Sequence, residues 1–337
     1  MIVPLIGKLD RERARTLILQ QGLSYEDSFA TQFGIYLDNR LVATAARDHN
    51  IFKMFAIDPE YQGSSLLGEL VSALLQNGYQ AGYKSFFVFT PPTSVNSFES
   101  CNFKPLITHH KVCLLQFGNG LKTYLAVHKH QVRSGSNGAV VVNCNPFTLG
   151  HLYLIESAAR QVDHLYVFVV REDRSFFPFD VRYRLVEQGV AHLNNVTVLD
   201  SDDYAVSGVT FPSYFLKADE DVQALQMELD LLLFAKHLAP FFNIKTRFVG
   251  TEPYCRTTRT YSEFMQQMLP PFGMQAVQLE RCTVDGEVIS AFRVRQALRK
   301  EAYETVRRLV PPTTIDFLLS DSGRELQKKL SNYPRRH

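Results

Sequence analysis

The sequence predicts an α/β protein with two domains, an α+β domain over residues 1–132 and a parallel-sheet domain over residues 138–337. The chain has 337 residues, more than one hydrophobic core usually organises. Residues 134–138 place Ser, Gly, Ser, Asn and Gly between two apolar runs, a composition typical of a turn or linker. Beyond them, apolar runs of strand length alternate with helical segments, which favours a parallel sheet covered on both faces.

In the N-terminal domain, the spacing of apolar residues predicts helices over residues 8–21 and 66–82. Two strands are expected within residues 33–47, separated by a turn at residues 38–40. Further strands are predicted over residues 51–59, where Pro59 ends the strand, and over residues 85–90.

In the C-terminal domain, four nearly continuous apolar strands alternate with helices. The strands are predicted over residues 138–146, 164–170, 196–201 and 244–250, and the helices over residues 151–162, 181–193 and 222–238. This order is Rossmann-like, and such sheets bind ligands at the carboxyl ends of their strands. The residues that follow each strand are therefore where a site is expected.

Composition excludes several classes of protein. The net charge is +2 without a long basic run, which argues against nucleic acid and membrane surfaces as partners. Five widely spaced cysteines without a CxxC pair argue against a disulfide framework or a zinc site, and they favour the cytoplasm. The N-terminus lacks a signal-peptide pattern, and the most apolar run, residues 229–242, is too short to span a bilayer.

The sharpest functional signal is NPFTLGH, residues 145–151, at the junction of the first parallel strand and its helix. A helix N-terminus presents backbone N–H groups and a positive dipole end to an anion. Gly150 would let a phosphate approach closely, His151 could donate a hydrogen bond to it, and Thr148 would add a hydroxyl. The alternative is that Thr148 only caps the helix and that His151 is a surface residue.

This strand–TxGH–helix pattern resembles the (H/T)xGH signature of the nucleotidylyltransferase superfamily, in which the motif holds the phosphates of a nucleoside triphosphate. The resemblance assigns Thr148 and His151 to catalysis, and Gly150 to nucleotide binding together with its neighbours Asn145, Pro146 and Phe147.

A second superfamily motif, ISxTxxR or ISxSxxR, usually opens a late helix. Residues 289–295 supply Ile289, Ser290 and Arg295, with Phe292 where the second hydroxyl usually stands. Ser290 is expected to cap the helix or contact a phosphate, and Arg295 to neutralise the β- and γ-phosphates of ATP. The alternative for Arg295 is a solvated helical arginine.

Polar residues follow other strands at the same edge. The superfamily's nucleotide-contacting loop corresponds to Gly250, Thr251 and Glu252. Arg182 could face the site or form a structural salt bridge, and the remaining candidates are Asp173, Phe179, Ser207, Thr210 and Lys217. No P-loop and no HExxH motif occurs, so no protein ligands for a metal are predicted, and Mg²⁺ would be held by the phosphates and water.

The N-terminal domain resembles a GNAT-type acetyltransferase. The resemblance rests on the order of its elements, on the segment AIDPEYQGSSLLGELVSALL and on residues 101–106. Gln62 matches the first position of the family's Q/RxxGxG/A loop, which cradles the pyrophosphate of acetyl-CoA at a helix N-terminus. Ser65 and Leu67 stand where that loop has small residues, so this acetyl-CoA site departs from the pattern.

Over nearly the whole chain, the pairing of these two domains resembles the citrate (pro-3S)-lyase ligase family, and GTEPYCRTTRTYSEFM, residues 250–265, is the most discriminating segment. The resemblance implies an enzyme that activates acetate with ATP, through acetyl-AMP and with release of pyrophosphate. The acetyl group then passes to the thiol of a phosphoribosyl-dephospho-coenzyme A arm on the acyl-carrier subunit of citrate lyase.

Three alternatives remain open at this point. One is a simple adenylyltransferase acting on a coenzyme precursor, a second is a coenzyme A-dependent acetyltransferase, and a third is a non-catalytic nucleotide sensor. Within the ligase interpretation, no cysteine is expected to relay the acetyl group, and Cys144 beside the motif is expected to be a core residue.

Overall fold

The computed structural model describes residues 1–337 except 172–174, 206–210, 217–220, 252–255, 285 and 331–337. The chain divides into two compact units, Met1–Ala126 with Val206–Leu229, and Val127–Ala205 with Asp230–His337. This division differs from the domain bounds that the sequence suggests, because residues 206–229 belong with the N-terminal unit although they follow a strand of the second unit.

The N-terminal unit is built on a seven-stranded sheet of order β1-β2-β3-β4-β5-β7-β6, in which only β4 and β5 pair in parallel. Its strands are β1 (Ile2–Pro4), β2 (Thr31–Leu37), β3 (Arg40–Asp48), β4 (Ile51–Ile57), β5 (Phe86–Thr90), β6 (Lys104–Ile107) and β7 (Cys113–Phe117). The strands predicted around the turn at residues 38–40 are confirmed as β2 and β3. Asp38 and Asn39 have the positive φ that a tight hairpin requires.

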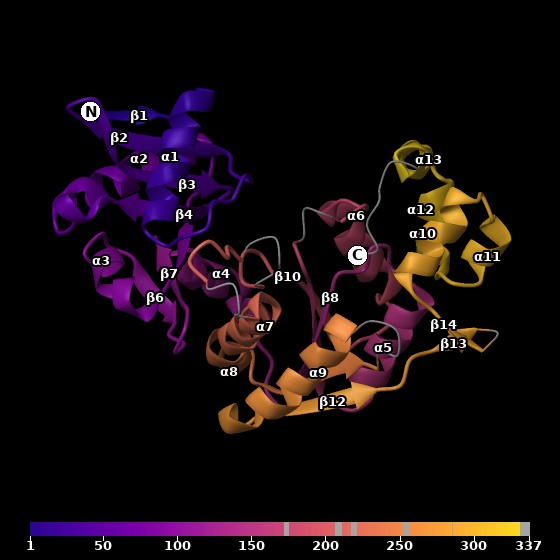
Figure 1. Ribbon diagram of the computed structural model, residues 1–337. Helices are drawn as coiled ribbons and strands as arrows, with labels where there is room; N and C mark the ends of the chain where they lie inside the picture. Colours follow the sequence, from indigo (N-terminus) through magenta and orange to yellow (C-terminus); the bar gives the residue numbers. More distant parts are fainter. Residues whose placement is uncertain (172–174, 206–210, 217–220, 252–255, 285, 331–337) are drawn as a thin grey trace. The chain divides into compact units, whose positions relative to one another are not determined.

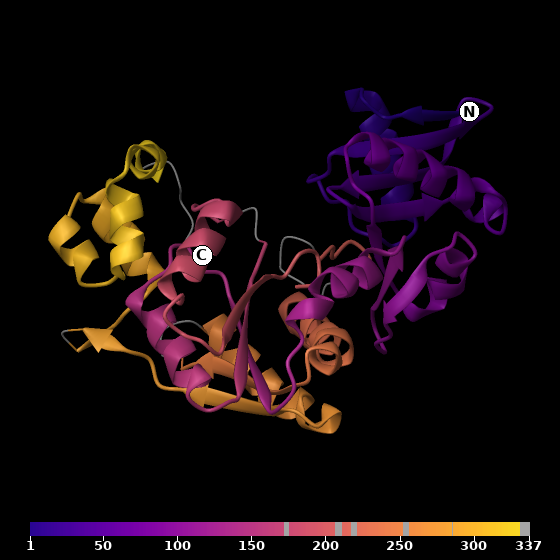
Figure 2. The same ribbon diagram turned by 180° about the vertical axis from the view of Figure 1, so that it is seen from behind.

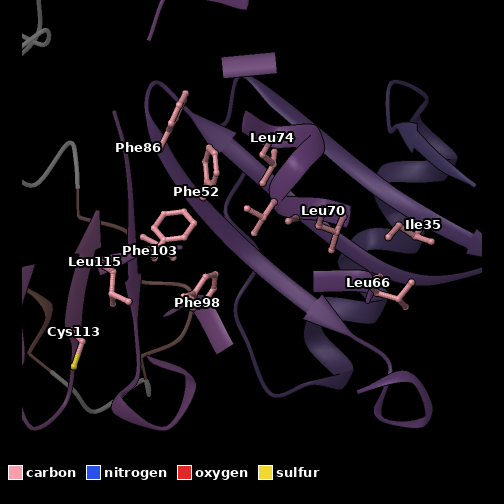
Figure 3. Close-up of a cluster of buried hydrophobic side chains, with 14 of the residues drawn as sticks. Ile35, Phe52, Leu66, Leu70, Leu74, Phe86, Phe98, Phe103, Cys113 and Leu115 are labelled. Atoms are coloured by element: carbon pink, nitrogen blue, oxygen red, sulfur yellow. The ribbon is translucent and has the colours of Figure 1, made fainter. Parts of the chain in front are cut away.

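Helices cover this sheet in two separate apolar clusters. The helices are α1 (Lys8–Gln20), α2 (Leu66–Gln80), α3 (Val95–Glu99) and α4 (Gly120–His128). Figure 3 shows the larger cluster, where Leu66, Leu70 and Leu74 of α2 lie against strand residues such as Phe52 and Phe86. Helix α1 packs into the other cluster. The fold is the α+β arrangement that the acetyltransferase resemblance implies.

The second unit contains the predicted parallel sheet, of order β10-β9-β8-β11-β12 (Figure 1). The strands are β8 (Asn137–Val142), β9 (His164–Val169), β10 (Val196–Asp200), β11 (Ile244–Gly250) and β12 (Gln275–Leu279). The four predicted strands are confirmed. Strand β12 escaped the sequence pattern because it is a half-exposed edge strand with glutamines at two of its five positions.

Both faces of this sheet are covered (Figure 1 and Figure 2), by the helices α5 (Leu149–Ala159), α6 (Phe179–Gly189), α8 (Ala239–Phe241) and α9 (Arg256–Met268). Helix α7 (Val222–Leu233) belongs to the N-terminal unit as far as Leu229. Leu165, Val167 and Val169 of β9 pack in the α5–α6 cluster. On the other face, Tyr166 and Phe168 contact the ring of Phe242. This alternation explains why β9 reads as continuously apolar.

The helix predicted over residues 222–238 is not one continuous α-helix. It ends as α7 at Leu233, and a π-helical turn, Phe234–Leu238, joins it to α8. Pro240 lacks the N–H that would bond back into the preceding turn, so the α-helical ladder is interrupted at this point.

The remainder of the unit is a hairpin followed by short helices. The hairpin pairs β13 (Thr283–Val284) with β14 (Glu287–Val288), and the helices are α10 (Ala291–Arg299), α11 (Tyr303–Arg307), α12 (Pro312–Leu319) and α13 (Asp321–Lys328). Among the described residues, no helix has both the length and the apolarity needed to cross a bilayer.

Candidate functional site

The candidate site lies at the carboxyl end of β8, the central strand of the parallel sheet. Residues 143–148 connect β8 to α5, with β9 paired on one side of the strand and β11 on the other. The chain proceeds from β8 outward to β10 and then returns to the opposite side at β11, so this edge is a topological switch point. Open α/β sheets bind ligands at such points.

Thr148 and His151 form a reciprocal capping box at the start of α5. The Thr148 hydroxyl oxygen accepts the backbone N–H of His151 at 3.3 Å, and Nδ1 of His151 accepts the backbone N–H of Thr148 at 3.1 Å. Because Nδ1 is an acceptor, the proton of the neutral ring is on Nε2, which can donate to a ligand. Thr148 is thus a helix cap, while His151 is partly buried.

The imidazole of His151 is neutral at physiological pH. Burial, with a smaller contribution from the positive charge of Arg281, lowers the pKa of His151 to about 4. The ring can therefore serve as a fixed N–H donor, and it gains no positive charge above about pH 5.

The N-terminus of α5 is less open than that of an isolated helix. The backbone N–H of Leu149 donates to the carbonyl of Leu309 at 2.9 Å, and the N–H of His151 is taken by Thr148. Between them, Gly150 lies against the second motif, since a Cβ there would be 3.1 Å from the Ile289 carbonyl oxygen. The glycine is therefore required for the contact between the two motifs, in addition to any role at a phosphate.

Residues of the second motif contact the loop and helix start of the first. Ser290 is the N-cap of α10, and its hydroxyl accepts the backbone N–H of Arg293 at 3.3 Å. Arg295 is only 2% exposed, and its Nη1 donates to the carbonyl of Asn145. Arg295 is thus not a solvated helical arginine, and in this state its guanidinium holds the loop that precedes α5.

The same loop is held from two further sides. The side-chain oxygen of Asn145 accepts the backbone N–H of Phe177 at 3.0 Å. The carbonyl of Phe147 accepts the buried hydroxyl of Thr314, from α12, at 3.1 Å. Phe147 is fully buried, and Pro146 lies between these two anchored residues. These contacts fix the loop before any ligand binds, which is the preorganisation that electrostatic catalysis requires.

Residues at and beyond the ends of β11 and β12 lie at the same edge of the sheet. Gly250 ends β11, and a Cβ there would be 3.4 Å from Nε of Arg281. The hydroxyl of Thr251 accepts the backbone N–H of Arg281 at 3.2 Å, and Thr251 itself donates from its N–H to the Leu279 carbonyl. Glu252, the third predicted member of this loop, lies outside the described residues.

Arg281 is the site residue that sequence reasoning missed. It lies two residues beyond the end of β12, so the rule that sites lie beyond strand ends would have found it had that edge strand been recognised. The neighbouring Cys282 accepts the N–H of Ile289 with its carbonyl at 3.1 Å, and Ile289 in turn lies on Gly150. This chain of contacts runs from Arg281 to the start of α5.

Arg182, the candidate left open between two roles, is structural. It is completely buried, and its guanidinium donates to the backbone carbonyls of Phe177, Asn143 and Val170 at 2.8–2.9 Å. It ties together the ends of β8 and β9. The ring of Phe179 lies beneath it at 5.6 Å. The candidates Asp173, Ser207, Thr210 and Lys217 lie outside the described residues.

The thiol beside the motif is a core group. Cys144 is 1% exposed, and burial raises the pKa of its thiol, so it stays protonated and unreactive. The described residues contain no group of three or more His, Cys, Asp or Glu side chains arranged to hold a metal ion.

Comparison with known proteins agrees with this geometry. Residues 137–318 match the family model for the citrate lyase ligase C-terminal domain. The chain is 37% identical over 326 residues to the citrate (pro-3S)-lyase ligase of Klebsiella pneumoniae, covering 94% of this chain and 95% of that protein. It is 34% identical to the Escherichia coli K12 protein of the same name, covering 89% and 87%. A phosphopantetheine adenylyltransferase of Streptococcus gordonii is 34% identical over 114 residues, 32% of this chain and 68% of that protein.

Proposed function

This chain belongs to the citrate (pro-3S)-lyase ligase family, and from that premise we propose that it acetylates the acyl-carrier subunit of citrate lyase at the expense of ATP. The enzyme is an AMP-forming acid–thiol ligase. Its substrates are ATP, acetate and the thiol of the carrier's phosphoribosyl-dephospho-coenzyme A arm, and its place of action is the cytoplasm. The observation that carries the proposal is the TxGH loop, which is held rigid at the switch point of the parallel sheet.

In the first step, a carboxylate oxygen of acetate attacks the α-phosphorus of ATP. The bond from that phosphorus to the oxygen bridging to the β-phosphorus breaks, so that acetyl-AMP forms and pyrophosphate leaves with the bonding electron pair. Acetate is already ionised near pH 7, so this step needs no general base. The protein's task is to place the two reactants in line and to stabilise charge on the phosphates.

The side chains at this edge are suited to that task. The Nε2–H of His151 donates to an oxygen on the α-phosphorus, and the positive end of the α5 dipole points the same way. Thr148 sets the orientation of the imidazole ring. Arg281 supplies positive charge from the β12 side, while Arg295 and Ser290 keep the loop and α10 in place.

Magnesium is proposed as the companion of ATP. The described residues offer no cluster of carboxylates for it, so the phosphates and water would provide its ligands. When bound, Mg²⁺ neutralises phosphate charge that these side chains leave uncompensated.

In the second step, the carrier thiolate attacks the acetyl carbonyl of acetyl-AMP, and AMP leaves with its phosphate oxygen. The thioester product is the acetylated carrier. The buried thiol of Cys144 is unsuited to accept the acetyl group on the way, which supports a direct transfer over a relay through this cysteine.

The deciding experiment measures pyrophosphate release from ATP and magnesium, with and without acetate, followed by addition of the carrier subunit. Acetate-dependent release and an acetylated carrier thiol are expected. Pyrophosphate release that does not depend on acetate but requires a phosphopantetheine acceptor would instead establish the adenylyltransferase alternative. That alternative is considered because of the shorter similarity to the Streptococcus gordonii adenylyltransferase.

A further inference from the structure

The sheet of the N-terminal unit contains an opening between β4 and β5. The two strands pair in parallel only at Ile51 with Phe87 and at Phe52 with Val88. Beyond these pairs β4 continues to Ile57 and β5 to Thr90 without further pairing between them. The divergence begins at a bulge in β4, where Met54 has a φ of 57° and the register against β3 shifts.

Residues 211–215 contact both strands that border this opening. Phe211 packs edge-on against Phe89 of β5, with ring centroids 5.3 Å apart. Tyr214 is 4% exposed and belongs to the apolar cluster of α1 and β4, which includes Met54. Its backbone carbonyl accepts the N–H of Ser24 at 2.7 Å.

The Tyr214 hydroxyl lies at the bulge itself. Burial raises the pKa of Tyr214, and backbone hydrogen bonds from Met54 and Phe55 oppose that rise. The Tyr214 side chain therefore lies against the main chain of the β4 bulge.

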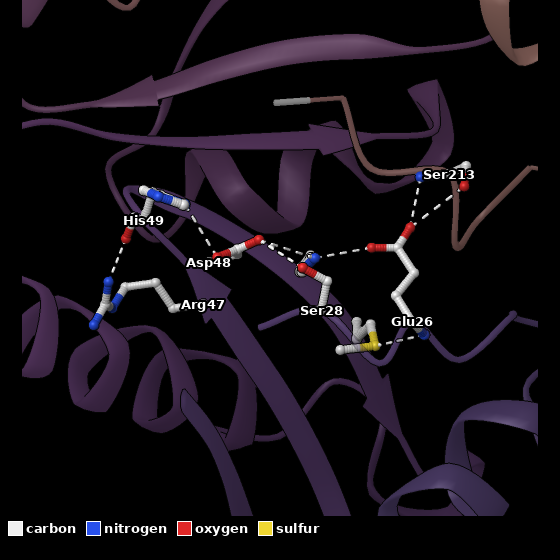
Figure 4. Close-up of polar contacts among 8 residues, drawn as sticks. Glu26, Ser28, Arg47, Asp48, His49 and Ser213 are labelled. Atoms are coloured by element: carbon white, nitrogen blue, oxygen red, sulfur yellow. Dashed lines mark hydrogen bonds and ion pairs between the residues drawn. The ribbon is translucent and has the colours of Figure 1, made fainter. Parts of the chain in front are cut away.

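A partly buried ion cluster contacts the segment through Glu26 (Figure 4). Glu26 accepts the backbone N–H of Ser213 at 2.7 Å with one carboxylate oxygen and the ammonium of Lys53 at 3.0 Å with the other. Lys53 is 5% exposed and also lies 3.7 Å from Asp48. Removal of the segment would leave a carboxylate oxygen of this cluster without its main-chain donor, which is costly for a partly buried charge.

The phosphate cradle expected at the start of α2 is also altered. Besides Ser65 and Leu67 in place of small residues, Glu69 lies in the first turn, where its carboxylate accepts the Ser65 hydroxyl at 2.8 Å. The backbone N–H of Leu66 is directed to the Ser64 hydroxyl at 3.5 Å. A helix start that already carries a carboxylate repels a pyrophosphate.

We propose that the opening between β4 and β5 is a receptor for the chain's own residues 211–215, and that the N-terminal unit, whose helix α2 carries Glu69 in its first turn, does not bind acetyl-CoA. The occupant is a main-chain segment with two aromatic anchors, Phe211 and Tyr214. The unit thereby holds residues 211–215, which lie in the sequence between β10 of the second unit and α7.

The test is amide hydrogen exchange on the full-length protein, with and without acetyl-CoA. In the wild type, the amides of Ser24 and Ser213 are expected to be protected about a hundredfold or more. Glu26→Gln is expected to reduce the protection at Ser213 about tenfold, because the acceptor loses its charge. Tyr79→Phe, a change on the exposed surface of α2, serves as the control and leaves both amides unchanged.

Acetyl-CoA at millimolar concentration should alter neither the exchange at Met54 and Phe55 nor the protection at Ser24. Two results would overturn the proposal. One is unprotected exchange at both Ser24 and Ser213 in the wild type, and the other is acetyl-CoA binding that newly protects the β4 bulge. Pyrophosphate release measured on the same samples reports the ATP chemistry separately, so failure of this inference and failure of the ligase assignment are distinguishable.

Discussion

Replacing His151 by Ala removes one hydrogen-bond donor from the transition state and leaves the fold of α5 to its other contacts. The ring is held by Thr148 through Nδ1, so the lost donor is Nε2–H, aimed from a preorganised position. Loss of one such donor costs about 3–4 kcal/mol in comparable sites, or a factor of about a hundred to a thousand in kcat. The assay is acetate-dependent pyrophosphate release at saturating ATP.

The matched control is His192→Ala. His192 lies just after α6, is exposed, and pairs at 3.1 Å with Glu156 of α5, so the same substitution is made away from the TxGH loop. The control should keep its rate within about twofold, as surface changes usually do. A His151→Ala enzyme within about fivefold of wild type would refute the assignment of this histidine to the α-phosphate.

The pKa of His151 is lowered to about 4, so the pH dependence distinguishes a neutral hydrogen-bond donor from a positively charged imidazolium. A depressed pKa keeps the ring neutral, so protonation begins only as the pH falls toward that value. Between pH 6 and 8 the ring resonances of His151 should not titrate. The His151→Ala substitution should also leave the shape of the pH–rate profile unchanged over this range. A titration near pH 6.5 would show that the imidazole is not held as described.

The remaining predictions concern Arg281, the thiol of Cys144 and the Mg²⁺ proposed to accompany ATP. Arg281→Ala should raise the KM for ATP about tenfold with the stability unchanged. The control Arg293→Ala removes the ion pair with Glu287 and should leave the KM unchanged. Equal KM values for the two variants would contradict the placement of Arg281 at the site. Cys144→Ala should retain acetylation of the carrier, measured by mass spectrometry, and an inactive variant that still releases pyrophosphate would establish a relay. Chelation with EDTA should abolish pyrophosphate release and added Mg²⁺ restore it; full activity in EDTA would contradict the proposed phosphate-bound ion.

Much of the site's location followed from local sequence signals. The TxGH loop is bounded by a buried strand and a helix, and Thr148 caps that helix with the geometry its residue type favours. Ser290 likewise caps α10 as expected. Both are interactions between residues three apart, which a sequence displays directly.

What the sequence could not display were contacts between distant segments. Arg182 and Arg295 are arginines near helix starts, and nothing local distinguishes a phosphate ligand from a clamp on backbone carbonyls. Only burial by elements far along the chain decides the question. The position of residues 211–215 on the N-terminal sheet is of the same kind, since it depends on a bulge at Met54 that no periodicity reveals.

The contacts that hold the TxGH loop come from residues synthesised late, which affects when this loop can become ordered during translation. The carbonyl of Leu309 and the hydroxyl of Thr314 close contacts to Leu149 and Phe147, residues made far earlier. A nascent chain can complete all five strands of the parallel sheet by Leu279 and still lack these two partners. Until the last helices emerge from the exit tunnel, the loop before α5 lacks these contacts, so a chain terminated after Leu279 would lack the fixed loop on which the proposed ATP chemistry depends.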